Sequence, residues 1–236
     1  MAEIDATGRS TREINLAIRQ SIAEGSTNIT VVNPGARHNL AVAILEPVHI
    51  RIAGSAGYYC GGLIDGPSIE IEGSAGWGLA ESMLSGTLRV HGNAGSGAAA
   101  AIRGGTVVIR GDAAARLGVS MKGGLVIVAG NCGYMAGFMA QKGTLIVCGD
   151  AGDAFADSMY ATVCYVGGKI NSLGTDAVVS TMETGDTEQV EQALSTYFPA
   201  DLRKTKPAAA NFKKVVAGRK LWNFDKRDWR IWQEAL

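Results

Sequence analysis

Three histidines are the side chains of this 236-residue chain best suited to acid–base chemistry at neutral pH. His38 and His49 lie near the beginning of the sequence, and His91 follows about forty residues later. None of them has a cysteine, aspartate or serine at the spacing of a recognisable triad or ligand set. We therefore expect ordinary surface or turn histidines, and we predict no catalytic residue in this chain.

Four cysteines could in principle bind a metal or an iron–sulfur cluster, but no two of them form a CxxC pair. Cys164 falls at a position where the sequence otherwise has buried strand residues, and Cys132 at one that otherwise has alanine. We expect reduced, buried thiols in a cytoplasmic protein, with no metal and no cofactor bound by this chain.

Glycine-rich phrases could cradle a phosphate, but their spacing assigns them to the architecture of the fold instead. The phrase GSAGYYCGG loosely resembles a dinucleotide-binding loop, yet no long helix follows it. An unbroken period of 19 residues indicates stacked repeats, each burying its apolar face against its neighbours. The period is marked by seven glycines, called here the repeat glycines: Gly54, Gly73, Gly92, Gly111, Gly130, Gly149 and Gly168.

The residues around each repeat glycine predict one coil of a parallel β-helix. Apolar and mostly β-branched residues stand two and four positions before it, as Ile52 and Ile50 do before Gly54, which is the pattern of a strand with one buried face. A further apolar column ten positions after the glycine, as at Ile64, predicts a second extended segment that points inward. Nineteen residues are too few for a βαβ unit. The expected fold is all-β: a single-stranded right-handed parallel β-helix of about seven coils, roughly 34 Å long.

The N-terminal segment is expected to cap the open end of the β-helix. Ser10 and Glu13 form a capping box for a short amphipathic helix that ends by Gly25. Residues 28–32 and 40–45 then have the composition of strands.

After Gly168 the period ends and a second helix is expected. Asp186 and Gln189 form its predicted capping box, and the helix ends near Pro199. The chain therefore divides into an N-terminal helix and strand cap (1–47), the β-helix (48–174), and a C-terminal helix with an extended tail (175–236).

The outward face of the predicted strands changes character along the β-helix. Three positions before the repeat glycine the first coils have Arg51, Glu70 and Arg89, whereas the later coils have an apolar set that should be covered. The cover is either the chain's own C-terminal segment or another subunit. In the first case, truncation after Ala200 should expose the set and cause aggregation or loss of assembly. We call this set the outer ladder: Val108, Ile127, Ile146 and Tyr165.

The last residues combine basic and aromatic side chains. Such a tail suits single-stranded nucleic acid or anchoring onto a protein surface, and we favour the latter. A net charge of zero argues against a nucleic-acid or membrane-surface role for the whole chain, and no apolar run is long enough to span a membrane. The candidate anchoring residues are Trp222, Phe224, Trp229 and Trp232.

Residues 33–174 resemble the C-terminal domain of the large chain of glutamate synthase, known for its GXGXG β-helix. The matching phrases are GSAGYYCGG, EIEGSAGWGLAESMLSGTLRV and SMKGGLVIVAGNCGYMAGFM, and NPGARHNLAVAI is similar to the lead-in strand of that domain. The whole chain, including the LWNF tail, is more similar still to the free-standing β-helix subunit of N-methylglutamate synthase complexes.

This resemblance implies a β-helix without catalytic residues in a hetero-oligomer of three subunits. The expected partners are a glutamine-amidotransferase-like subunit and a subunit resembling the FMN and iron–sulfur synthase domain. The implied reaction joins methylamine and glutamate to give N-methylglutamate and ammonia. The chain departs from glutamate synthase at four aromatic positions, Tyr58, Tyr59, Trp77 and Tyr134.

Two other functions fit a β-helix. One is the β-helical C subunit of a formylmethanofuran dehydrogenase complex, which is also a scaffold. The other is a stand-alone lyase or acyltransferase. Lyases of this shape need an acidic calcium cluster, and the outward positions of this chain lack one. Hexapeptide acyltransferases have coils of 18 residues, which does not fit the period of 19 found here.

Overall fold

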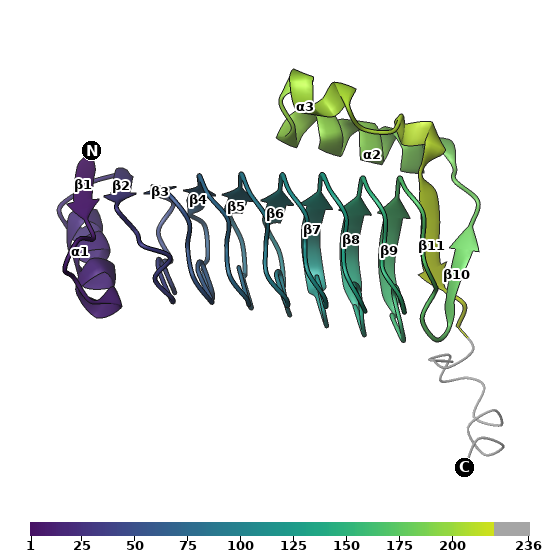
Figure 1. The fold of residues 1–236 in the computed structure, drawn as a ribbon, viewed down its shortest axis with the longest axis horizontal. Helices are drawn as coiled ribbons and strands as arrows, with labels where there is room; N and C mark the ends of the chain where they lie inside the picture. Colours follow the sequence, from purple (N-terminus) through teal and green to yellow (C-terminus); the bar gives the residue numbers. More distant parts are fainter. Residues whose placement is uncertain (220–236) are drawn as a thin grey trace, which may run out of the picture.

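The computed structural model describes residues 1–219, which wind into a long β-helix with helices at one end and along one side (Figure 1). Within this range the strands form one 11-stranded sheet in the order β1-β2-β3-β4-β5-β6-β7-β8-β9-β11-β10. The elements are β1 (Ala2–Asp5), α1 (Thr11–Ala23), β2 (Asn28–Val32), β3 (His49–Ala53), β4 (Ser68–Ile71), β5 (Thr87–Val90), β6 (Thr106–Ile109), β7 (Lys122–Val128), β8 (Lys142–Val147), β9 (Ala161–Val166), β10 (Ala177–Ser180), α2 (Thr184–Tyr197), α3 (Ala200–Lys204), η1 (Ala209–Asn211) and β11 (Lys213–Ala217).

The strands stack in parallel, one per coil, as the period predicts. In β3 and β4, Ile50 pairs with Ile69 and Ile52 with Ile71, and the same 19-residue register continues to β7. The two apolar columns are fully buried along the β-helix. Because a parallel stack buries one face of every strand against the same interior, this core fixes the register of each coil. The prediction of an all-β parallel β-helix of about seven coils is confirmed.

The side of each coil opposite the strand is not extended, and here the sequence prediction was wrong. Residues five, seven and nine positions after the repeat glycine have left-handed backbones, as at Tyr59, Gly61 and Leu63 after Gly54. The expected strand at residues 40–45 is likewise a series of turns. Alternate left-handed residues change the direction of successive side chains, so the inward positions are four apart, as at Cys60 and Ile64. We call this side, positions four to eleven after each repeat glycine, the turn face.

The first coil begins before Gly54. Strand β2 pairs in parallel with β3, and the N–H groups of Ala36 and Asn39 donate to the carbonyls of Ser55 and Tyr58. The winding therefore extends into residues that the sequence pattern assigned to the N-terminal cap.

Helix α1 closes the N-terminal end (Figure 1). It begins at the predicted capping box, since the Ser10 hydroxyl and backbone N–H both contact the Glu13 carboxylate. Within the helix, the Asn15 side-chain amide donates to the carbonyl of Asn39 and accepts from the N–H of Ala41. Backbone groups that would otherwise form an open edge are satisfied in this way.

The C-terminal end is closed by two antiparallel strands. Strand β11 pairs with β9, and β10 pairs with β11. Helices α2 and α3 lie along one side of the C-terminal half of the β-helix (Figure 1). Helix α2 begins earlier than predicted, because its cap residue is Glu183, whose N–H donates to the Asp186 carboxylate; Gln189 plays no part in the cap.

Candidate functional site

The repeat glycines are required by the close approach of successive coils. A Cβ atom on Gly111 would overlap the side chain of Asn93 and the backbone of Gly92, and the other repeat glycines from Gly73 onward meet the preceding coil in the same way. Of the seven, only Gly54 has a φ in the left-handed region. Their side-chain space is therefore filled by the protein itself, which leaves no cradle for a phosphate.

A polar ladder runs beside these glycines. The Asn93 carboxamide oxygen accepts from the Asp112 N–H at 2.8 Å, and the Asp112 carboxylate accepts from the Asn131 N–H at 2.7 Å. Asn131 and Asp150 continue the series into the following coils. Each of these side chains satisfies a backbone donor at a coil corner, so the ladder has a structural role.

The outer ladder is buried beneath the chain's own C-terminal segment. Val108, Ile127, Ile146 and Tyr165 are at most 1% exposed and form a second core with Val190, Ala193, Leu194, Phe198, Ala209 and Phe212. Helix α2 ends at Tyr197, so a truncation after Ala200 would keep α2 but remove Ala209 and Phe212 from the cover, and its effect on aggregation and assembly stays a prediction. The tail residues Trp222, Phe224, Trp229 and Trp232 lie outside the described residues.

A charged network fastens α2 to the sheet. The Tyr165 hydroxyl donates to the Asp186 carboxylate at 2.6 Å, and Lys214 of β11 lies 2.8 Å from the same carboxylate. Burial raises the pKa of Asp186, but the hydrogen bonds from Lys214 and Tyr165 outweigh it and hold the pKa below its usual value. Burial and the neighbouring Asp186 raise the pKa of Tyr165, which therefore remains a hydrogen-bond donor at neutral pH.

The outer face of β3 and β4 has paired polar and charged side chains. The Arg51 Nε donates to Glu72 at 2.8 Å, and His91 Nε2 lies 2.6 Å from Glu70. Burial raises the pKa of Glu70, but its hydrogen bond and charge interaction with His91 outweigh this and lower the pKa. These polar side chains pair with one another between adjacent coils.

Exposed aromatic side chains gather on the turn face instead. The rings of His38, Tyr58 and Trp77 form a stack, with centroids 4.3 Å and 5.3 Å apart. The four aromatic positions that distinguish the chain from glutamate synthase are all exposed here: Tyr58, Tyr59, Trp77 and Tyr134.

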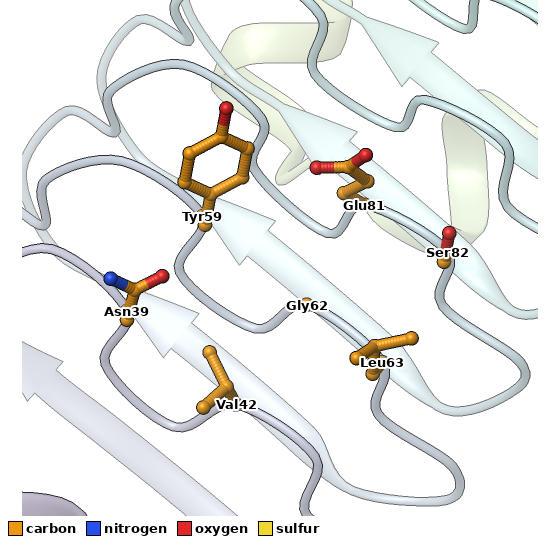
Figure 2. Close-up of a pocket in the computed structure, with 7 residues that line it drawn as sticks. All are labelled: Asn39, Val42, Tyr59, Gly62, Leu63, Glu81 and Ser82. Atoms are coloured by element: carbon orange, nitrogen blue, oxygen red, sulfur yellow. The ribbon is translucent and has the colours of Figure 1, made fainter.

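Two adjoining hollows border Tyr59 and Glu81. The first, about 400 Å³, lies between coils, with Asn39 and Val42 on one coil and Ser82 on another (Figure 2). The second, about 470 Å³, extends from Trp77 past Arg116 to Tyr134. Both are open, shallow and lined mainly by apolar and aromatic groups, which suits a macromolecular contact better than an enclosed small-molecule site.

In residues 1–219 the cysteine thiols are buried, and the possible metal-ligating side chains are spread apart. All four cysteines are free and buried, and burial raises the pKa of Cys60, Cys132 and Cys148 to about 12. Within residues 1–219 no three histidine, cysteine, aspartate or glutamate side chains gather as a metal site. No helix in this range is long and apolar enough to cross a bilayer.

Comparison of the sequence with models of known protein families identifies the family of this chain. The family model described as "GXGXG motif" matches residues 25–217, which is most of the chain and nearly all of its described part. The chain belongs to the GXGXG motif family. The match extends from the end of α1 to the end of β11, so the covering helix α2 lies inside the GXGXG region along with the coils.

A relative of similar length supports this membership. The chain is 44% identical over 227 residues to Protein GlxC of Rhizobium meliloti (strain 1021), an alignment that covers 95% of this chain and 97% of that protein. The similarity to this relative therefore extends beyond the residues that the GXGXG model matches.

Sequence reasoning found the repeat glycines, the outer ladder and the unusual aromatic residues, but it missed what connects them. It did not identify Lys214 as a partner of Asp186, because the two are 28 residues apart without any periodic relation. It treated the aromatic residues as departures from a family pattern, whereas the structure places them side by side on one face.

Proposed function

We propose that this chain is a non-catalytic β-helix subunit of a glutamate-synthase-like enzyme complex. The single observation that carries the proposal is the GXGXG match over residues 25–217. The geometry supports it, because the polar residues of the repeat bind neighbouring coils and the cysteines are enclosed, which leaves the described surface suited to holding other proteins.

The finer assignment is to N-methylglutamate synthase, in which methylamine and glutamate give N-methylglutamate and ammonia. In this proposal the β-helix holds a glutamine-amidotransferase-like subunit and a synthase-like subunit with FMN and an iron–sulfur cluster in register in the cytoplasm. The regular stack favours such a role, because each coil is bonded to both neighbours, helix α1 closes one end and the antiparallel strands β10 and β11 close the other. The support for this level of detail is the resemblance of the full-length sequence.

Purification of the untagged chain from its native source tests the proposal. We expect co-purification of an amidotransferase-like and a flavin-containing protein, and methylamine-dependent formation of N-methylglutamate that is lost when this chain is removed and restored when it is added back. The chain alone should contain neither flavin nor iron.

Three results would contradict it. Stoichiometric FMN or iron on the isolated chain would show a cofactor-binding protein. Co-purification with a molybdenum or tungsten protein would indicate a formylmethanofuran dehydrogenase-type complex. Activity with ammonia and none with methylamine would leave the glutamate-synthase-like subunit standing but remove the finer assignment.

A further inference from the structure

The aromatic residues of the turn face follow a pattern of rings and gaps along one column. We number the coils from Gly54 (coil 1) to Gly130 (coil 5). Four positions after the repeat glycine, coils 1 and 2 have Tyr58 and Trp77, coils 3 and 4 have Ser96 and Ala115, and coil 5 has Tyr134. The two small residues leave the 470 Å³ hollow between the rings of coils 2 and 5. The column therefore presents two protruding rings beside a gap two coils long.

Such a pattern is complementary to itself in the antiparallel direction. A two-fold axis that lies in the contact plane, perpendicular to the β-helix and midway between coils 2 and 3, exchanges coil 1 with coil 4 and coil 2 with coil 3. It keeps each column opposite the same column. Trp77 of one copy then enters the space above Ser96 of the other, and Tyr58 the space above Ala115, twice over. At the two ends Tyr134 meets Asn39, the residue of the preceding coil in this column, beside the His38 ring that stacks on Tyr58.

A second column has the matching arrangement of charge. Eleven positions after the repeat glycine, coil 1 has Asp65 and coil 2 has Leu84, whereas coils 3 and 4 have Arg103 and Lys122. All four side chains are exposed. The same axis places Asp65 of each copy opposite Lys122 of the other. The aromatic column and the charged column are therefore both self-complementary about the same point, midway between coils 2 and 3.

A third column, which lies between these two, is also self-complementary about this two-fold axis. Five positions after the repeat glycine, Tyr59 of coil 1 would face Arg116 of coil 4, a cation above an aromatic ring. Gly78 of coil 2, against which the Tyr59 ring of its own copy lies, would face Gly97 of coil 3, beside which the space is open.

From these three columns we infer that the turn face of coils 1 to 5 binds a second copy of the same chain, antiparallel, with the rings of each copy seated in the gap of the other. The inference is independent of the proposed enzyme complex, and a complex built on this dimer would contain two β-helices. The exposed fractions of Tyr58, Tyr59, Trp77 and Tyr134 are 40%, 46%, 57% and 52%.

The size of the contact sets the concentration range of the experiment. Aromatic side chains bury about 150–250 Å² each when fully enclosed, so burying the exposed half of four rings per copy removes roughly 600–1,000 Å² in total. With the surrounding coil surface this is at the low end of specific interfaces. We therefore expect dimerisation in the micromolar range.

Sedimentation velocity of the full-length chain between about 1 and 200 μM tests the inference. The wild type should convert from monomer to dimer within this range. Ala115→Trp fills the gap with a ring and should weaken the dimer at least about tenfold. The substitution is compatible with folding, since Trp77 occupies the same position of coil 2, and circular dichroism checks this. Leu16→Trp, which adds the same ring to an exposed position of α1, should leave the dissociation constant unchanged.

Charge reversal tests the register. Asp65→Lys and Lys122→Asp should each weaken the dimer about fivefold at low salt, because each places like charges in contact twice. Mixing the two variants should restore wild-type affinity, since every contact in the mixed dimer again joins opposite charges.

Several outcomes would overturn the inference. A chain that stays monomeric at every concentration has no such contact. A dimer unaffected by Ala115→Trp uses another surface, and a mixture no tighter than its separate components excludes this register.

Discussion

Replacing Tyr165 with phenylalanine should loosen helix α2 from the β-helix while leaving the coils intact. The ring is 1% exposed in the outer ladder, and phenylalanine keeps that packing. Only the hydroxyl is lost, together with its 2.6 Å bond to the Asp186 carboxylate. Hydrogen bonds to charged groups contribute about 1.5–3 kcal/mol. Because Asp186 retains its bonds to Lys214 and to the Glu183 N–H, we expect the lower part of that range, about 1.5–2 kcal/mol.

Hydrogen exchange of the α2 amides is the suitable assay, because a stack of repeats need not unfold in one step and α2 can detach locally. A loss of about 1.5–2 kcal/mol corresponds to roughly a 10- to 30-fold lower protection factor for the amides of residues 190–194. The amides of β4 and β5 should keep their wild-type protection, since they lie far from the substitution.

Tyr197→Phe is the matched control. It also removes one tyrosine hydroxyl between α2 and the sheet, here from α2 itself, but that hydroxyl makes only a 3.3 Å contact with the Thr106 hydroxyl and should contribute under about 1 kcal/mol. If Tyr165→Phe and Tyr197→Phe lower α2 protection equally, or if neither does, the charged network does not fasten the helix and our reasoning is wrong.

Three further predictions follow from contacts within the described chain. The pKa of the Asp186 carboxyl is lower in the folded state, so the stability that this carboxylate contributes is present above the unfolded pKa of about 3.9 and is lost as the pH falls through the folded pKa. The hydrogen-exchange protection of α2 should therefore decline below about pH 4 in the wild type. A protection that does not change with pH, or the same pH profile in Asp186→Asn, would contradict this. Asn131→Ala removes the acceptor for the Asp150 N–H at 2.7 Å and should lower the free energy of unfolding by about 1–3 kcal/mol in urea titrations, whereas Asn131→Asp keeps the acceptor and should change it little. Ellman's reagent should label no thiol of the native chain and all four after denaturation, and rapid native labelling of any one would show that its burial is incomplete: Cys60, Cys132, Cys148 and Cys164.

Much of the fold could be predicted because the information repeats. One coil alone gives an ambiguous pattern of apolar residues, but seven coils in phase place the same columns inward each time, as at Ile50 and Ile69. The capping box at Ser10 is equally local, since its two partners are three residues apart. Features that depend on short spacing or on strict periodicity can therefore be predicted from the sequence alone.

The geometry of the turn face could not be predicted in this way. Apolar residues ten positions after the repeat glycine suggested an extended segment, but residues such as Leu63 and Ala80 have left-handed backbones. This conformation is uncommon for leucine and alanine and could not be predicted from the residue types. The second capping box was mispredicted because Glu183 is not a residue type that favours the N-cap position, and only the fold shows that its N–H contacts Asp186.

The sequence by itself determined the winding, the register of the coils and the position of an apolar surface that had to be covered. Tertiary structure alone decided that α2 is the cover, that Tyr165, Asp186 and Lys214 meet beneath it, and that Tyr58 and Trp77 stand beside a gap. The physical reason is the range of the interactions. Coil stacking repeats the same contact every 19 residues and so leaves a periodic trace, whereas each of these groupings occurs once and joins side chains whose separation along the chain follows no period.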